Sequence, residues 1–383
     1  MFWTSLFVLS GAFIAYILLG YPLLLGLLAK YGARPVHKSE AQKSVSVIVC
    51  VHNGERFLRD KLNSVLALDY PAERMEILVV SDGSTDATAC IAREFAGRGV
   101  KLLEVPKGGK PAALNAGIPG LRGEILLLTD VRQRLDRESL RRLVECFGDP
   151  TVGVVSGELL IGKGESQEEA DVGLYWRYES WIRKQLGSLD SIFGATGPFY
   201  AMRRELAVRI PPHMLLDDVY LPMAAFFRGY RLIVEETALA YDYPTTLDTE
   251  FKRKVRTLAG NYQIIRAYPK LLGPGNRMWL HFVSYKLGRL AMPYALVALA
   301  ASSLYLPGRW MALAAGGQAL FYGLAAADRW VPQTFLLKPV SSPARTFVVM
   351  MAAAVCALSV FFVSPQSLWK ETKIAPARQA GGY

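Results

Sequence analysis

Residues 76–86, EILVVSDGSTD, join a short apolar run to an aspartate, and residues 124–130, EILLLTD, repeat the arrangement. Three more β-rich runs lie at 44–51, 100–105 and 151–161, and they alternate with helical patterns at 55–66, 86–95 and 137–147. Such alternation predicts βαβ units on a mostly parallel sheet whose faces are covered by helices. The sequence therefore predicts an α/β fold.

The two aspartates, Asp82 and Asp130, fall where such sheets bind ligands, beyond the carboxyl ends of the strands. Asp82 alone is explained equally well as turn and N-cap chemistry, because Ser84, Thr85 and Asp86 follow it. Two carboxylates at equivalent strand ends indicate more than a cap. We expect them to meet in one crevice, where a nucleotide and a cation can use them.

A glycine-rich stretch, KGGKPAALNAG at 107–117, lies between the two aspartates. Its glycines permit a close backbone approach, a helix is expected to begin at Pro111, and Lys110 beside that helix start suits a diphosphate. The alternative is a surface turn with a solvated lysine. The GxxxxGK[ST] spacing and a GxGxxG after the first run are both absent, so kinase, ATPase and dinucleotide-oxidoreductase interpretations lose their main support.

The second half of the soluble region carries three further motifs: FGATGPFYA at 193–201, LDDVYLP at 216–222 and FKRKVRTLAG at 251–260. Paired carboxylates such as Asp217 and Asp218 are often only caps that favour a helix dipole. No acidic residue occurs from 251 to 280, while basic residues accumulate just before an apolar region. That basic run suits anionic lipid head groups, a leaving diphosphate, or both.

Apolar residues, 52% of the 383-residue chain, are concentrated near its two ends. Residues 1–29 contain no charged side chain, and the run 6–28 is long enough to cross a membrane as a helix. Three shorter runs lie at about 290–306, 310–327 and 346–363, and the stretch 278–289 has an interfacial composition. By the positive-inside rule, the basic residues after the first run lie in the cytoplasm. Four crossings leave the basic tail outside, so the alternative is that one C-terminal segment is interfacial or re-entrant.

The predicted organisation is a multi-pass protein of the cell (inner) membrane with a cytoplasmic catalytic domain. It comprises an anchor at 1–29, a basic juxtamembrane segment at 30–43, one domain at 44–280, an interfacial segment with C-terminal transmembrane helices at 281–369, and a tail at 370–383. The chain carries a net charge of +11, yet residues 44–280 hold 31 basic and 30 acidic side chains. This balance argues against a nucleic-acid partner. Four scattered cysteines and four scattered histidines predict reduced thiols and no zinc site.

Taken in order, seven motifs of this chain resemble those of the family-2 glycosyltransferases of GT-A fold. They are SVSVIVCVHNGE, VVSDGSTD, GGKPAALNAG, LLLTD, GATGPFYAMRRE, LDDVYLP and RKVRTLAG. The resemblance is to the membrane-anchored group that includes cellulose, chitin, hyaluronan and poly-N-acetylglucosamine synthases, and it covers about 44–280. It implies a Rossmann-like GT-A domain and a nucleotide-sugar donor.

The resemblance also implies roles for individual residues. Asp82 matches the acid that contacts the base, Lys110 a lysine near the donor, and Asp130 the first acid of the DxD motif, which holds a metal and the donor diphosphate. Asp218 matches the general base of the TED motif, with Asp217 in place of its glutamate. The remaining expected site residues are Val51, Asn53 and Glu55 for the donor, Gly194, Thr196 and Gly197 in the acceptor loop, and Arg253 and Arg256 where the synthases carry QxxRW.

Two motifs depart from the family pattern. The DxD is Asp130-Val131-Arg132, so the second acid is missing. A divalent cation, Mg²⁺ or Mn²⁺, is expected at Asp130, unless Arg132 supplies the positive charge; Asp136 is an alternative second acid. The QxxRW motif lacks its glutamine and its tryptophan. Processive polymerisation is therefore less favoured than the resemblance alone implies.

The predicted function is inverting transfer of a sugar from a nucleotide-sugar donor, expected to be UDP-linked, to a membrane-associated glycan or lipid acceptor. Such a step belongs to cell-surface polysaccharide or glycolipid synthesis. One alternative is a non-processive monosaccharide transferase acting on polyprenyl phosphate or glycolipid. Another, of a different class, is a degenerate relative that binds nucleotide or polymer and serves as an export or assembly partner.

Overall fold

A computed structural model describes residues 1–40, 42–161, 167–243 and 246–368. The chain forms two compact units. The globular unit comprises Tyr31–Gly162 and Arg183–Asp242, and the helical unit comprises Met1–Lys30, Lys163–Ile182 and Tyr243–Tyr383. The domain boundaries predicted from the sequence stay a prediction.

The globular unit is built on an eight-stranded sheet with the order β3-β2-β1-β4-β7-β6-β8-β5. The strands are β1 (Val45–Val51), β2 (Met75–Asp82), β3 (Val100–Val105), β4 (Ile125–Asp130), β5 (Arg134–Leu135), β6 (Val152–Ile161), β7 (Phe199–Arg203) and β8 (Arg231–Asp242). Strands β1 to β4 pair in parallel, whereas β7 runs antiparallel to both β4 and β6. The α/β class and all five predicted strands are confirmed; β5, β7 and β8 were not predicted.

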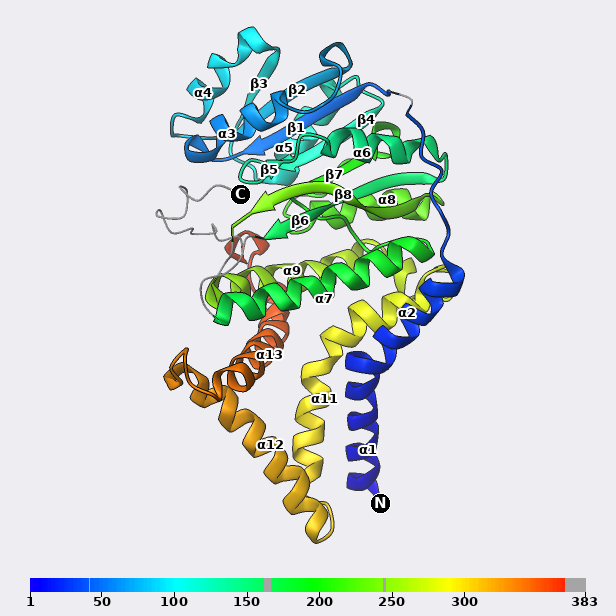
Figure 1. Ribbon diagram of the computed structural model, residues 1–383, viewed down its shortest axis with the longest axis vertical. Coiled ribbons are helices and arrows are strands. Elements are labelled where there is room, and N and C mark those ends of the chain that lie inside the picture. The colour runs from blue at the N-terminus through cyan, green and yellow to red at the C-terminus, as the bar shows by residue number, and fades with distance from the viewer. Residues whose placement is uncertain (41, 162–166, 244–245, 369–383) are drawn as a thin grey trace. The chain divides into compact units, whose positions relative to one another are not determined.

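Helices cover both faces of this sheet (Figure 1). One face packs its apolar side chains against α3 (Glu55–Leu66), α4 (Thr88–Glu94) and α6 (Ser139–Glu145) in a single core cluster. The other face meets α5 (Lys110–Gly117), whose Gly117 lies so close to Ile48 and Val80 that an added Cβ would come within 2.8 Å of each. Because alternate strand residues are buried on opposite faces, the central strands β1 and β4 are buried along nearly their whole length and are mostly apolar.

The helical unit contains a set of apolar helical segments: α1 (Phe2–Ala15), a π-helical turn (Tyr16–Gly20), α2 (Tyr21–Gly32), α11 (Gly288–Ser303), α12 (Arg309–Ala327) and α13 (Lys338–Cys356). Helix α1 packs against α11, and α13 packs against both α12 and α9 (Leu247–Ala267). In the described part of the chain, three helical segments are long and apolar enough to cross a membrane: Phe2–Gly32, Arg309–Trp330 and Lys338–Phe361.

These segments overlap three of the four predicted crossings, 6–28, 310–327 and 346–363. The fourth, 290–306, falls largely on α11, which has 16 residues and is not one of the three. The predicted interfacial stretch 278–289 forms the short α10 (Trp279–Phe282), a π-helical turn and the first residues of α11. The predicted tail, 370–383, lies outside the described residues.

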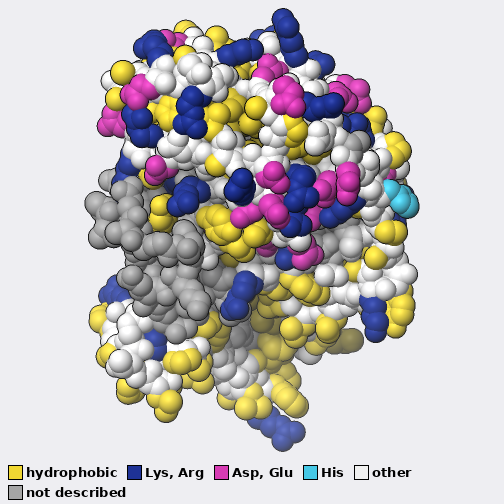
Figure 2. Space-filling view, turned by 45° about the horizontal axis from the view of Figure 1, so that its top comes forward, with side chains coloured by type: hydrophobic (Ala, Val, Ile, Leu, Met, Phe, Trp, Pro, Cys, Tyr) yellow, Lys and Arg dark blue, Asp and Glu magenta, His cyan; other side chains and the backbone are white. Residues whose placement is uncertain are grey.

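In the upper part of the face drawn in Figure 2, charged side chains of both signs are interleaved rather than gathered into separate patches. Ion pairs account for part of this pattern. On α6, for example, Arg142 pairs with Glu138, and Arg141 lies 3.2 Å from Glu145. The near-neutral balance of residues 44–280 is therefore present locally as well as in total.

Candidate active site

Lys110 links the ends of three elements. Its Nζ lies 2.8 Å from Asp130 Oδ1 at the end of β4 and 3.2 Å from Asp217 Oδ2 at the start of α8 (Asp217–Phe227). Lys110 itself begins α5. Burial opposes its charged form, but Asp130, Asp217 and Asp218 outweigh that effect and hold its pKa well above the ordinary value. Residues from three separate sequence motifs thus meet in one charged cluster.

The Asp130 carboxylate is surrounded by positive charge. Burial alone raises the pKa of an acid, yet Lys110, Lys61 and Arg132 reverse that effect and lower the pKa of Asp130. Asp130 therefore stays ionised at neutral pH. The negative charge of Asp130, at the end of β4, is therefore already compensated by nearby basic side chains of the protein.

Asp82 organises the loop that leads to Lys110. The backbone N–H groups of Gly108 and Gly109 donate to its two carboxylate oxygens at 2.7 and 2.8 Å. Gly83 has φ +59°, and a Cβ there would lie 2.7 Å from the Lys107 backbone nitrogen, so only glycine fits this turn. The predicted contact between Asp82 and a nucleobase stays a prediction, because the described partners of this carboxylate are loop amides.

The loop after β1 is tied to the loop after β2. Asn53, with φ +49°, accepts a hydrogen bond from the Thr85 backbone N–H at 2.8 Å, and Glu55 accepts one from the Ala87 N–H at 3.0 Å. Val51 is buried at the end of β1. The structure thus gives these three predicted donor residues local roles, and their contact with a donor stays a prediction.

The acceptor-loop residues lie against the start of α8. The Ala195 N–H donates to the Asp218 carbonyl at 2.8 Å, and Gly194 has φ +109° beside Val219. A Cβ at Gly197 would lie 2.6 Å from Asp218 Oδ2, so the absence of a side chain there makes room for this carboxylate. The structure brings the GATG loop and the predicted base together.

The two acids at the start of α8 have different surroundings. Asp217 is 4% exposed and its carboxylate is ion-paired with Lys110. Asp218 is partly exposed and borders Gly197. A general base must reach a substrate proton, and the more open carboxylate is the better placed.

Sequence reasoning missed two cations that hold this region. Arg183 on α7 (Gln167–Leu189) donates to Thr196 Oγ1 at 2.7 Å and to Ser156 Oγ at 2.9 Å. Lys61 on α3 is 1% exposed and donates to Thr129 Oγ1 at 2.5 Å and to the Gln133 carbonyl at 2.7 Å. Their partners are 13 to 72 residues away in the sequence, so no local pattern signals either role.

The predicted arginines of the QxxRW region lie on α9, in the helical unit. Arg253 lies 3.3 Å from Glu250, and its guanidinium carbon is 5.6 Å from the centre of the Trp176 ring. Arg256 is one turn nearer the end of α9. Contact of either arginine with a diphosphate or an acceptor stays a prediction.

The described residues do not fit a site that holds a divalent cation by protein ligands. They contain no group of three His, Cys, Asp or Glu side chains able to surround a metal. The position of the second DxD acid is occupied by Arg132, which pairs with buried Asp242. Asp136, the other expected acid, accepts hydrogen bonds from Tyr241 at 3.4 Å and from the Glu138 N–H at 3.1 Å. Mg²⁺ and Mn²⁺ require several oxygen ligands, and here Asp130 alone remains at the motif.

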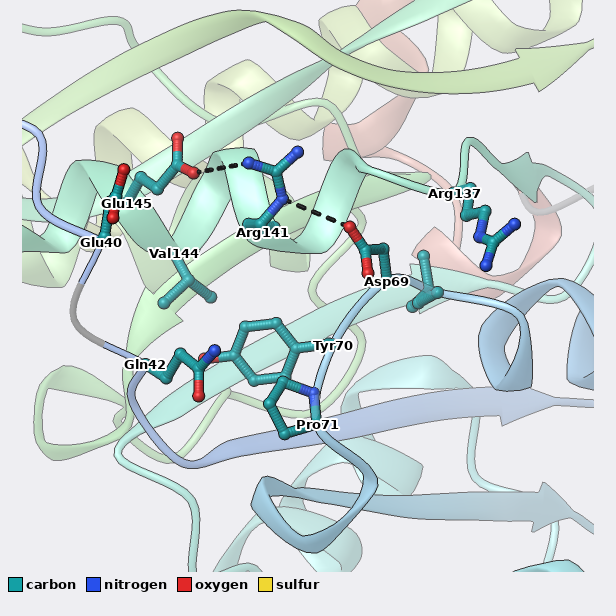
Figure 3. A pocket seen from close by; sticks show the side chains of 10 residues that line it. Glu40, Gln42, Asp69, Tyr70, Pro71, Arg137, Arg141, Val144 and Glu145 are labelled. Atoms are coloured by element: carbon teal, nitrogen blue, oxygen red, sulfur yellow. Dashed lines mark hydrogen bonds and ion pairs between the residues drawn. The ribbon is translucent and has the colours of Figure 1, made fainter.

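A separate hollow of about 590 Å³ lies between α6 and the segment that follows α3 (Figure 3). Tyr70 and Pro71 line one side, and Arg141 lies opposite, ion-paired with Asp69 at 3.5 Å and Glu145 at 3.2 Å. None of the predicted site residues lines this hollow. Two of its acidic side chains, Asp69 and Glu145, are already paired with Arg141.

Residues 46–210 match the family model described as glycosyl transferase family 2. The poly-beta-1,6-N-acetyl-D-glucosamine synthase of Staphylococcus epidermidis is 27% identical over 242 residues, which cover 60% of this chain and 57% of the relative. The synthase of Staphylococcus aureus (strain COL) is 26% identical over 240 residues, 58% of this chain and 56% of the relative. The matched region thus spans little more than half the length of these curated relatives.

Among solved structures, the mannosyltransferase PcManGT from Pyrobaculum calidifontis, in complex with GDP-Man and Mn²⁺, has a similar fold. Its TM-score is 0.71 at 24% sequence identity, and the superposition covers 93% of this chain and 99% of that chain. This likeness extends the shared fold beyond the region that the family model matches.

Proposed function

We propose that this chain, which is a glycosyltransferase of family 2, transfers a sugar from a nucleotide-sugar donor to a membrane-associated glycan or lipid acceptor with inversion at the anomeric carbon. One observation carries the proposal: Lys110 joins Asp130 and Asp217, so the strand end, the glycine-rich loop and the Asp217-Asp218 helix start form one site. A UDP-linked donor is the form we propose.

The proposed reaction is a single displacement. Asp218 takes the proton from an acceptor hydroxyl while that oxygen attacks the anomeric carbon of the donor sugar. The bond between that carbon and the diphosphate oxygen breaks, and the nucleoside diphosphate leaves with the bonding electrons. Lys110 stabilises the negative charge that develops on the diphosphate. Asp217 holds Lys110 in place through the ion pair at 3.2 Å.

Membrane attachment supports an acceptor that is itself at the membrane. The three apolar helical segments are consistent with a multi-pass protein of the cell membrane, and we propose that the globular unit lies on the cytoplasmic side, where the positive-inside rule places the basic residues after Phe2–Gly32. In this arrangement, Arg253 and Arg256 would serve the diphosphate or the acceptor.

Transfer of a single sugar is favoured over polymerisation by one feature of α9. Thr257 occupies the position of the QxxRW tryptophan, so α9 presents no aromatic ring there to stack on a growing glycan. Product length separates the two possibilities. A lipid extended by one sugar supports single transfer, and a ladder of products supports a synthase.

The test uses membranes that contain the full chain, incubated with labelled nucleotide sugars one at a time. Wild type should transfer label to lipid or glycan, while Asp218→Asn should bind nucleotide and lose transfer. Asp60→Asn makes the same change at an exposed carboxylate on α3 and should behave as wild type. Turnover by Asp218→Asn would refute the base assignment. Nucleotide binding by wild type without transfer from any donor would instead support an export or assembly partner.

A further inference from the structure

We propose that the donor diphosphate is bound by the protein's own cations, Lys110 and Arg132, and that nucleotide binding needs no divalent metal ion. The inference rests on the proposed function and specifies how its donor site works. A divalent cation is expected at Asp130, but the residues that the structure places around Asp130 do not form a metal site.

The carboxylates around the end of β4 already have cationic partners. Asp130 and Asp217 share Lys110, at 2.8 and 3.2 Å. Asp242 is 2% exposed and pairs with Arg132, while Gln133 donates to the same carboxylate at 2.9 Å. A divalent cation at Asp130 would therefore have to displace Lys110 and find its other oxygen ligands elsewhere.

Arg132 has donor capacity beyond its ion pair. A guanidinium carries five N–H donors in a fixed fork, and that fork suits the paired oxygens of a phosphate. The Nε of Arg132 is buried and makes no hydrogen bond in the described part of the chain. Its side chain is 15% exposed and that of Lys110 is 17% exposed, so both cations are largely shielded from bulk water. Shielding strengthens their attraction for an anion.

Lys61 fixes the turn that carries Asp130 and Arg132. Its Nζ donates to Thr129 Oγ1, just before the turn, and to the Gln133 carbonyl, just after it. Thr129 in turn donates to the Pro198 carbonyl at 2.9 Å, which ties the turn to the GATG loop. These two hydrogen bonds of Lys61 hold the turn in place from beneath Asp130. Lys110 and Arg132, the two cations proposed to attract the diphosphate, repel a divalent metal ion.

The experiment measures binding of UDP and of GDP to the purified full chain in detergent, after removal of metal ions. Titrations are made with EDTA and again with MnCl₂. We expect one nucleotide to bind in EDTA, with a dissociation constant that changes by less than about threefold when Mn²⁺ is added. Binding that is at least tenfold weaker in EDTA would overturn the inference and leave the proposed function intact. Failure of both nucleotides to bind under either condition would overturn the proposed function, and the inference with it.

Two variants of Arg132 and one control variant test whether Arg132 binds the diphosphate. The unfolding temperature of each variant checks that it is folded. Arg132→Gln should weaken nucleotide binding in EDTA by about tenfold or more, because a charge-assisted hydrogen bond is lost. Arg134→Gln removes an exposed arginine from the same segment and should leave binding unchanged. Arg132→Asp restores the two-acid spacing and should make binding depend on Mn²⁺. If leaving Asp242 unpaired prevents that variant from folding, the wild-type and Arg132→Gln titrations still decide the question, and a folded Arg132→Gln with wild-type affinity would overturn it.

Discussion

Gly197→Ala should separate the placement of the proposed base from donor binding. The added Cβ would lie 2.6 Å from Asp218 Oδ2, 3.3 Å from its Cγ and 3.6 Å from its Cβ. A carbon and an oxygen that are not bonded need more room than 2.6 Å, so the carboxylate has to rotate away. The backbone at Gly197 is not left-handed, so alanine fits the main chain.

The structure sets the size of each effect. The contact falls on the far end of a flexible side chain, so moving it to a strained rotamer costs about 1 kcal/mol and the fold should persist. A misplacement of about 1 Å at a reacting group lowers a rate by roughly 100-fold. Transfer should therefore fall about 100-fold, while nucleotide affinity stays within about twofold, because Asp82 and Lys110 are untouched.

The assay measures kcat for sugar transfer and the dissociation constant for the nucleotide on the same preparation. Gly120→Ala is the matched control, since no heavy atom lies within 4 Å of a Cβ added there. The control should keep the wild-type kcat. A folded Gly197→Ala protein that transfers sugar at the wild-type rate would refute the argument that Asp218 is held in a reactive position by the space at Gly197.

Three further substitutions test other parts of the site. Arg183→Met removes the hydrogen bonds to Thr196 and Ser156 and should lower kcat about tenfold or more with unchanged nucleotide affinity; an unchanged kcat would show that the network does not position the loop. Asp82→Asn replaces one of the two carboxylate oxygens that accept from Gly108 and Gly109 by an NH2 donor, so nucleotide affinity should fall about tenfold, and wild-type affinity would contradict the loop's role. Burial lowers the pKa of Lys61 to about 7, whereas in an unfolded chain it keeps its ordinary 10.5. Between these two pH values the unfolded chain binds more protons than the folded chain. Lys61 therefore makes the free energy of unfolding rise with pH across that window, by on the order of 5 kcal/mol. Lys61→Met should flatten the rise in unfolding temperature between about pH 7 and pH 10, and an equal rise in both proteins would contradict the assignment.

The parallel part of the fold was predictable because its signal is local. Strands β1, β2 and β4 each contain an apolar run of at least three residues, and polar residues follow it. Strand β7 was missed since Phe199–Arg203 reads as the end of a loop motif, and only its pairing with β4 and β6 makes it a strand. A register set by distant partners leaves no periodicity in so short a segment.

The site residues at the ends of strands and helices were predictable, whereas their long-range partners were not. Asp82, Lys110 and Asp130 stand at strand and helix ends, where backbone geometry concentrates ligand contacts. The sequence also showed that Arg132 replaces an acid, but its partner Asp242 is 110 residues away and could not be inferred. Lys61 looks like an ordinary polar residue of an amphipathic helix, yet it is fully buried beneath Asp130. Long-range ion pairs of this kind are fixed by tertiary packing, which local patterns do not encode.

The central claim is a single displacement in which Asp218 activates the acceptor. The most direct measurement is the anomeric configuration of the first product formed by wild type, determined by NMR on the transferred sugar, alongside the rate of Asp218→Asn. We expect a configuration inverted relative to the donor, and no product from the variant. A product of retained configuration, or comparable product formation by Asp218→Asn, would contradict it.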